Sequence, residues 1–281
     1  MIQISSELPK CLLDDEDNIN DYDFVLYHTY LKDSEYREHY LQKRIDKPNR
    51  LMILDNSAYE FFVSGEQFNE DDYIKVINEL KPDYYIVPDE LMNKDKTLQN
   101  FEHWIKFSIK KVNKKSKPYF TPQGRDKSEL LDCLWEMMDK INVRKLPKNL
   151  CFPFHNDFLR EMYIPQIVQD NFKFPLSTDD HYAAGRVALL FQLYYQGSLD
   201  GYRIHLLGSH NPRELNMLKR IPQIKTFDSG YPVKLGVEGI RIGTETEKPK
   251  TIIDNFYNKK LDTKTKNLIK HNVSQVRGYC K

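Results

Sequence analysis

The chain of 281 residues is long enough to bury one large core, and a single domain of about 250 residues fits within it. Its 42 lysine and arginine residues nearly cancel its 41 aspartate and glutamate residues, so the total charge does not indicate a nucleic-acid partner. Four scattered cysteines without CxxC or CxC spacing argue against a disulfide framework and a zinc site.

The same composition predicts a cytoplasmic protein. Unpaired cysteines are typical of a reducing compartment. The first residues, "MIQISSELPK", lack the charged start and apolar centre of a signal peptide, and no apolar run approaches the roughly 18 residues of a membrane helix. We therefore expect no membrane partner; if a phage encodes the chain, the compartment is the host cytoplasm.

Eight short apolar runs are predicted strands, and most are separated by segments whose apolar residues recur three and four apart, such as 71–80 and 128–141. This alternation predicts an α/β protein, a (β/α)₈ TIM barrel formed as one domain over residues 1–281, with a basic C-terminal extension at about 248–281. The predicted strands lie at 24–30, 51–55, 84–89, 118–124, 150–154, 203–209, 224–230 and 239–243.

Positive charge is segregated along the chain. Residues 106–117, "KFSIKKVNKKSK", hold six lysines and no acid, and residues 248–281 hold eight lysines and Arg277 against Asp254 and Asp262. Such segments can follow a phosphate backbone, although solvated lysines on helix faces are the commoner explanation for any one run. The candidate phosphate-binding residues are Lys110, Lys111, Lys114, Lys115, Lys259 and Lys260.

Polar residues end several of the predicted strands, and in a parallel barrel those ends meet at one mouth. Asp55 and Asp228 each follow an apolar run. For any one such aspartate, helix capping is the commoner role. Two carboxylates in one cleft nevertheless suggest displacement at an anomeric carbon, with one as nucleophile and the other as acid or base, a reading that includes ordinary glycosidases.

Asp89 and Gln123 end two further runs and suit another task. A carboxylate accepts N–H bonds, while an amide both donates and accepts, which matches the Watson–Crick edge of a guanine-like base. Tyr59, four residues after Asp55, offers an aromatic face on which that base can stack.

In this order the motifs resemble the tRNA-guanine transglycosylase superfamily, whose members exchange guanine for a 7-deazaguanine on a TIM barrel. "DNSAYE" resembles the segment that carries the family's general acid/base and stacking tyrosine, which implies those roles for Asp55 and Tyr59. Ser57 and Ala58 stand where the family has paired glycines, and Glu60 where it has glutamine.

The resemblance continues to about residue 236. "VPDEL" and "TPQGR" imply base recognition by Asp89 and Gln123, and "IHLLGSHNPREL" implies base contacts at Leu207 and Gly208. "FDSGYP" resembles the segment that carries the nucleophile, which implies that role for Asp228.

Two segments depart from the family. "LCFPFHND" replaces a glycine-rich strand whose backbone touches the base, so Cys151, Phe152 and Pro153 are candidates by position alone. The family's cysteine and histidine zinc motif is missing, so we expect neither a structural zinc nor another cofactor.

A short chain without the zinc module resembles the 7-deazaguanine DNA transglycosylases of phages and bacterial DNA-modification clusters. That resemblance implies DNA and a free base of the preQ0 or preQ1 type as substrates, protection of phage DNA from restriction, and accessory proteins that open the strand.

The alternatives are a tRNA-guanine transglycosylase acting on RNA, a glycoside hydrolase that uses Asp55 and Asp228, and a non-catalytic nucleic-acid-binding module whose carboxylates cap helices. The number of subunits stays open. The histidines at 155, 181, 205 and 210 receive no role.

Overall fold

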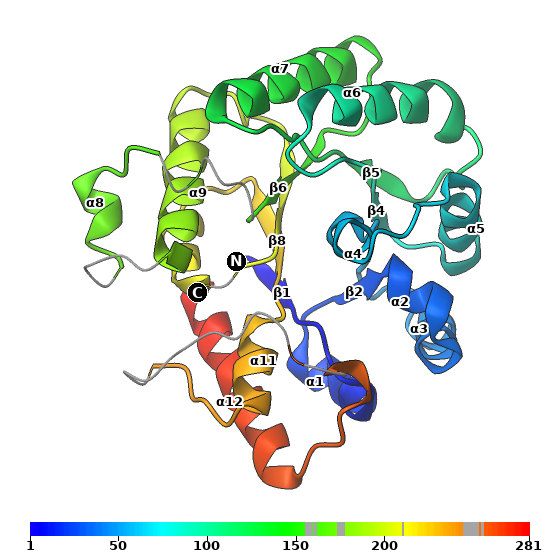
Figure 1. Ribbon diagram of the computed structural model, residues 1–281, viewed down its shortest axis with the longest axis vertical. Helices are drawn as coiled ribbons and strands as arrows, with labels where there is room; N and C mark the ends of the chain where they lie inside the picture. The colour runs from blue at the N-terminus through cyan, green and yellow to red at the C-terminus, as the bar shows by residue number, and fades with distance from the viewer. Residues whose placement is uncertain (155–158, 160–161, 173–177, 210, 244–252, 254–255) are drawn as a thin grey trace. The chain divides into compact units, whose positions relative to one another are not determined.

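The computed structural model describes residues 1–154, 159, 162–172, 178–209, 211–243, 253 and 256–281. Two compact units form within it: unit 1 comprises residues 1–21 and 153–281, and unit 2 comprises residues 22–152. Strands pair in parallel and helices connect them (Figure 1), so the predicted mixed α/β class is confirmed. The prediction of a single domain stays a prediction.

Unit 2 holds a parallel sheet in the order β2-β3-β4-β5. Its strands are β2 (Asp23–Leu26), β3 (Met52–Asp55), β4 (Tyr84–Ile86) and β5 (Lys117–Tyr119). Its helices are α2 (Tyr27–Lys32), α3 (Ser34–Asp46), α4 (Ala58–Ser64), α5 (Glu70–Leu80), α6 (Lys94–His103), the π-helix η2 (Trp104–Ser108) and α7 (Lys127–Val143).

The second sheet has the order β1-β8-β7-β6, and the boundary between the units falls inside β6 (Asn149–Pro153). Its other strands are β1 (Gln3–Ser5), β7 (Arg203–Leu207) and β8 (Ile224–Asp228). The described part of unit 1 holds the helices η1 (Lys10–Asp15), α1 (Glu16–Ile19), α8 (Gln166–Gln169), α9 (Thr178–Tyr195), η4 (Pro212–Glu214), α10 (Leu215–Leu218), α11 (Tyr231–Val237), η5 (Phe256–Asn258) and α12 (Thr263–Tyr279).

The two helices predicted from apolar spacing are present. Asn69 and Asp126 cap them, because their side chains accept hydrogen bonds from the backbone N–H groups of the first turn. Their buried residues recur three and four apart, so one face of each helix covers the core. These residues are Tyr73, Ile74, Val76, Ile77 and Leu80 in α5, and Leu130, Cys133, Leu134, Met137, Met138 and Ile141 in α7.

The strand predicted at 239–243 is wrong. Gly239 and Gly243 have φ values of +75° and +95°, in the left-handed region that ends regular structure. Ile240 N–H donates to Leu235 O at 2.9 Å and so terminates α11. The strand that the sequence analysis missed is β1, which pairs in parallel with β8 and is only three residues long.

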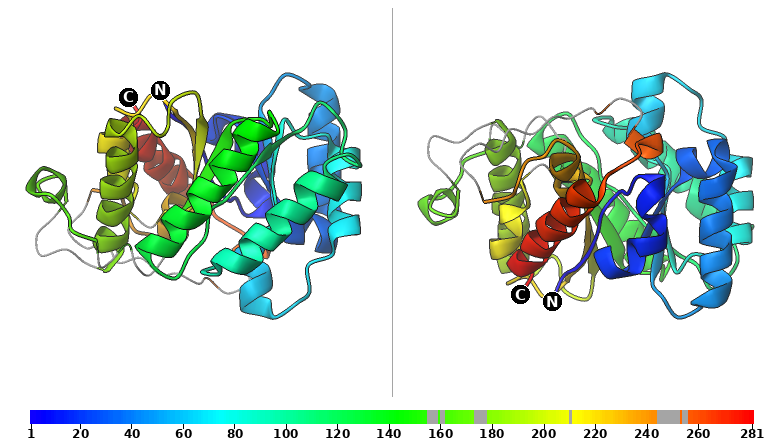
Figure 2. Two further views of the ribbon diagram at one scale, coloured as in Figure 1. Left: turned by 90° about the horizontal axis from the view of Figure 1, so that it is seen from above. Right: turned by 90° about the horizontal axis from the view of Figure 1, so that it is seen from below.

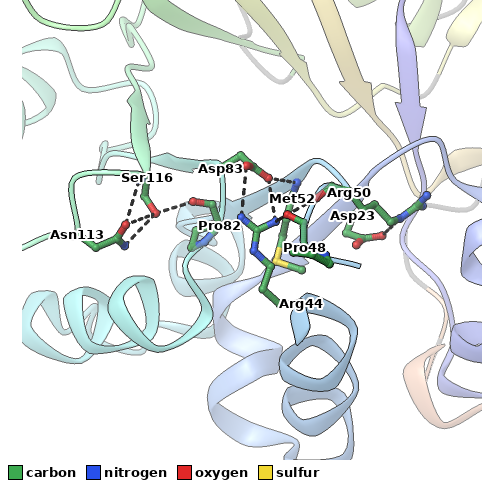
Figure 3. Close-up of polar contacts among 9 residues, drawn as sticks. All are labelled: Asp23, Arg44, Pro48, Arg50, Met52, Pro82, Asp83, Asn113 and Ser116. Carbon is green, nitrogen blue, oxygen red and sulfur yellow. Dashed lines mark hydrogen bonds and ion pairs between the residues drawn. The ribbon is translucent and has the colours of Figure 1, made fainter. Parts of the chain in front are cut away.

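Polar contacts hold the amino-terminal edge of the sheet in unit 2 (Figure 3). Asp83 accepts a hydrogen bond from Met52 N–H at 2.9 Å and forms an ion pair with Arg44 at 3.1 Å. Buried Asp23 binds Arg50 at 2.6 Å. In parallel α/β sheets, ligands bind at the carboxyl ends of the strands. We therefore expect a site at the opposite, carboxyl-terminal edge of this sheet.

Of the helices that the structure describes, none combines the length and the apolar composition needed to cross a membrane.

Candidate functional site

Asp55 ends β3 at the carboxyl edge of unit 2, as the sequence predicts. Its Oδ2 accepts a hydrogen bond from Ser57 N–H at 2.8 Å, which fixes the carboxylate on the turn between β3 and α4. Ser57 has φ 58° and ψ 34°, a conformation that favours glycine. The turn therefore carries backbone strain directly beside the carboxylate.

His28 supports this strained turn. Its backbone N–H donates to Ser57 Oγ at 3.2 Å, and its ring Nδ1 lies 3.0 Å from the same oxygen. Burial lowers the pKa of His28 to about 4, so its ring is neutral at pH 7. Ser57 is fully buried, which leaves its hydroxyl to the turn and not to a substrate.

The side chains of Asn56, Asp89 and Gln123, which follow β3, β4 and β5, form a hydrogen-bonded cluster with Asp89 at its centre. Gln123 Nε2 donates to Asp89 Oδ2 at 2.6 Å, and Asn56 Nδ2 donates to Asp89 Oδ1 at 2.7 Å. Asn56 Oδ1 in turn accepts from Ala58 N–H at 2.9 Å. Asp89 and Gln123 are therefore neighbours, and Asn56 is a member of the cluster that the sequence analysis missed.

The environment of Asp89 changes its protonation. Burial raises the pKa of Asp89 to about 6, and this effect outweighs the lowering caused by the hydrogen bonds from Asn56 and Gln123. At pH 7 the group is a carboxylate whose two oxygens each accept one amide N–H. Each oxygen keeps a second lone-pair site for a further donor.

The raised pKa of Asp89 makes the free energy of unfolding depend on pH, and Asp89→Asn should remove that part of the dependence. The folded chain binds the Asp89 proton more tightly than the unfolded chain, whose reference pKa is 3.8. Between pH 4 and pH 6 the folded state therefore holds more protons, so this contribution to the free energy of unfolding falls as pH rises, by at most about 3 kcal/mol. Urea unfolding from pH 4 to pH 7 measures it. The exposed Asp71→Asn is the control, and equal pH slopes for wild type and Asp89→Asn would contradict the assignment.

Tyr59 lies on α4, next to the turn at Asp55, and is 49 % exposed. No residue of α4 is buried. Phe62 and Val63 are exposed as well, at 58 % and 63 %. The helix therefore presents a partly apolar surface beside Asp55, and the ring of Tyr59 is accessible to a flat ligand.

Asp228 ends β8 in unit 1 and is 6 % exposed. Its Oδ1 accepts a hydrogen bond from Gly208 N–H at 3.1 Å and lies 3.2 Å from His205 Nε2. Gly208 has φ +61°, and this conformation turns its N–H towards the neighbouring strand end. No role is predicted for His205 from the sequence, yet its ring lies against the predicted nucleophile.

A buried ion pair holds the turn that contains Leu207 and Gly208. Arg186 and Glu214 are 1 % and 0 % exposed, and Arg186 Nε donates to Glu214 Oε2 at 2.9 Å. The guanidinium also donates to Leu207 O at 2.9 Å and to Gly208 O at 2.8 Å. It lies 5.0 Å from the ring centroid of Phe154. The position of Gly208 N–H therefore depends on Arg186.

The candidates in β6 are less accessible. Cys151 and Phe152 are buried, and Pro153 is only partly exposed, so any ligand contact here is expected from the backbone and not from the Phe152 ring. Residues 155–158, which include His155 and Asn156, lie outside the described residues, as does His210.

The four lysines of the first basic segment are not at the site in unit 2. Lys110, Lys111, Lys114 and Lys115 are exposed in the turn that leads into β5. Ser116 Oγ anchors this turn by donating to Pro82 O, just before β4, at 2.5 Å. The turn therefore lies at the amino edge of the sheet, opposite Asp55, Asp89 and Gln123. One of these lysines, Lys111, forms an ion pair with Asp71 at 3.4 Å.

Lys259 and Lys260, from the second basic segment, belong to unit 1. They follow η5, where the Phe256 ring is 5.8 Å from the ammonium of Lys234. Lys234 belongs to α11, which starts just after Asp228. The chain then enters α12, which lies along α11 (Figure 2). These two lysines are thus at the same edge of unit 1 as Asp228.

No group of three or more histidine, cysteine, aspartate or glutamate side chains that could hold a metal ion occurs in the described part of the chain. The clusters around Asp89 and Asp228 contain amides, backbone N–H groups and one imidazole. Comparison with models of protein families gives no match to this chain, and comparison with curated proteins gives none either.

Proposed function

We propose that the protein exchanges a base in DNA, replacing guanine by a 7-deazaguanine of the preQ0 or preQ1 type and thereby protecting the DNA from restriction. The observation that carries the proposal is the state of Asp228. It is a buried acidic side chain at a strand end, and its Oδ1 accepts a hydrogen bond from Gly208 N–H at 3.1 Å. A nucleophilic carboxylate needs this arrangement, because one oxygen must be fixed while the other attacks.

In the proposed reaction, Asp228 attacks C1′ of a deoxyguanosine. The C1′–N9 bond breaks, and its electron pair leaves with guanine, which takes a proton from the acid form of Asp55. N9 of the incoming base then attacks C1′ and gives its proton to Asp55, while the C1′–Asp228 bond breaks and restores the carboxylate. Two inversions retain the β configuration.

Base recognition is proposed for the second cluster. Asp89 at pH 7 can accept N–H bonds from a guanine-like edge, and Gln123 fixes one of its oxygens at 2.6 Å. Tyr59, half-exposed on α4, supplies a stacking face. Leu207 and Gly208 would contact the base beside Asp228, together with the backbone at Phe152 and Pro153.

We also propose that the strands close into one (β/α)₈ barrel. The sheet orders β2-β3-β4-β5 and β1-β8-β7-β6 follow the chain order that such a barrel requires. Leu150 of β6 forms a parallel bridge with Phe120, directly after β5, and Asp21 N–H, just before β2, donates to Ile4 O of β1 at 2.8 Å.

DNA is proposed as the partner because Lys259 and Lys260 lie at the edge of unit 1 that holds Asp228, where they can contact phosphate groups. A duplex hides C1′, so the nucleotide must leave the stack at a cost of a few kcal/mol. Accessory proteins that open the strand fit this requirement.

The test is incubation of the purified protein with DNA that contains labelled guanine, together with preQ0 or preQ1. We expect guanine release that depends on the added base, and a modified deoxynucleoside detected by mass spectrometry. Labelled tRNA is tested in parallel. Release from tRNA alone would move the activity to RNA, and sugar release with water as acceptor would make the protein a hydrolase. Binding of DNA without release would favour a non-catalytic module.

A further inference from the structure

We infer that His205 is a positioning residue, whose Nε2–H holds Oδ1 of Asp228 and so leaves Oδ2 as the oxygen that attacks C1′. The inference rests on the proposed function and adds to it a second donor, a tautomer and a choice between the two carboxylate oxygens.

The strand register brings His205 to Asp228. His205 in β7 pairs with Thr226 in β8. Thr226 and Asp228 are two residues apart on one strand, so their side chains project from the same face of the sheet. His205 projects from that face one step earlier, and its Nε2 reaches Asp228 Oδ1 at 3.2 Å.

The other ring nitrogen sets the tautomer. Nδ1 of His205 lies 2.9 Å from Thr226 Oγ1. In a neutral ring only one nitrogen carries a proton. If the Thr226 hydroxyl donates to Nδ1, Nε2 carries the proton and faces the carboxylate, which is the favourable arrangement beside a negative charge. Both His205 and Thr226 are fully buried, so water does not compete for these contacts.

In the protein without substrate, the buried His205 Nε2 lies 3.2 Å from Asp228 Oδ1 but does not yet form a hydrogen bond with it. Hydrogen bonds of catalytic groups are often long or poorly aligned before substrate binds and tighten in the complex. Gly208 N–H already binds the same oxygen at 3.1 Å. In the proposed complex the two N–H groups both face Oδ1, which assigns Oδ2 to the attack on C1′.

The two donors act most strongly in the second chemical step. When the incoming base attacks C1′, the C1′–Oδ2 bond breaks and its electron pair returns to the Asp228 carboxylate. Negative charge therefore develops on both oxygens, and donors to Oδ1 stabilise it. Loss of one such donor in a buried site lowers a rate by about 10²-fold to 10³-fold.

The kinetic test compares His205→Phe with His205→Gln. Phenylalanine fills the space without a donor, whereas the glutamine amide can donate to Oδ1. We expect His205→Phe to slow breakdown of the covalent protein–DNA adduct by about 10²-fold, and to raise the fraction of protein trapped as adduct during turnover. His205→Gln should restore most of the rate. A purely structural role would change protein stability without changing the partition between adduct and product.

The tautomer is measured without any substrate. Nitrogen-15 NMR of the histidine rings, with His205→Gln identifying the signals by their loss, should show a protonated Nε2 and a bare Nδ1 for His205. Thr226→Val should weaken this preference. A protonated Nδ1 in the wild-type protein, or His205→Phe with the adduct partition of the wild type, would overturn the inference. If the wild-type protein releases no guanine at all, the proposed function fails, and the NMR result still decides the tautomer and the donor to Oδ1.

Discussion

Asp228→Asn is expected to abolish base exchange, with a rate at least about 10⁴-fold below that of the wild-type protein. An amide does not form the ester to C1′ on which the proposed reaction depends. Its oxygen can still accept the hydrogen bond from Gly208 N–H, so the turn and the fold should persist. Guanine release from labelled DNA measures the rate, and denaturing electrophoresis of protein mixed with DNA measures the adduct, which should be missing.

The matched control is Asp200→Asn. Asp200 is exposed in the turn before β7, at the amino edge of the same sheet, and accepts a hydrogen bond from Gln223 at 3.3 Å. Its replacement should leave the exchange rate unchanged. If Asp228→Asn exchanges bases at the wild-type rate, Asp228 is not the nucleophile. If it binds DNA like the wild type and neither protein releases guanine, the carboxylate serves a binding module.

The sequence predicted the α/β class and the strand ends well, because both depend on local patterns. Alternating apolar runs and helical spacing reflect burial along one segment, and a carboxylate after a buried run marks a strand end. Asp55 and Asp228 accordingly end β3 and β8. The run at 239–243 misled because isoleucine between glycines matches a strand pattern, whereas two left-handed glycines place it in a turn.

The partners of these carboxylates depend on register, which one sequence does not fix. Asn56 is adjacent to Asp55, but its contact with Asp89 requires that β3 and β4 be neighbours. His205 becomes informative only when it is known to pair with Thr226, two residues before Asp228. Side chains alternate between the two faces of a strand. With the order of β7 and β8 known, this alternation would have placed His205 on the same face as Asp228.

The sequence does not show at which edge of a sheet each lysine-rich segment lies. A run of lysines looks the same at either end of a strand, but only the carboxyl edge of a sheet holds the predicted site. Lys110 and its neighbours precede β5 and so lie at the amino edge, whereas Lys259 and Lys260 lie at the edge that holds Asp228. Contact between the segment at 106–117 and DNA stays a prediction; the segment lies at the edge of unit 2 opposite Asp55.

Arg186→Leu is expected to lower the free energy of unfolding by about 3 to 5 kcal/mol, because it leaves the buried Glu214 carboxylate without its cation. It also removes the donors to Leu207 O and Gly208 O, which hold the turn beside Asp228. Urea unfolding measures the loss. The control is Lys270→Met, which removes a half-exposed ion pair with Asp15 at 2.8 Å in the same unit and should cost less than about 1 kcal/mol.

The double variant Arg186→Leu with Glu214→Leu separates two effects of losing Arg186: the uncompensated charge of Glu214 and the loss of the donors that hold the turn at Leu207 and Gly208. Without Glu214 no buried charge remains uncompensated, so the double variant should be more stable than the sum of the two single losses predicts. It should not recover full activity, because Gly208 O and Leu207 O still lack their donor and Gly208 N–H is no longer held against Asp228. Strictly additive losses would show that the two residues do not act as a pair. Wild-type exchange in a folded double variant would show that the turn does not need Arg186 to position Asp228.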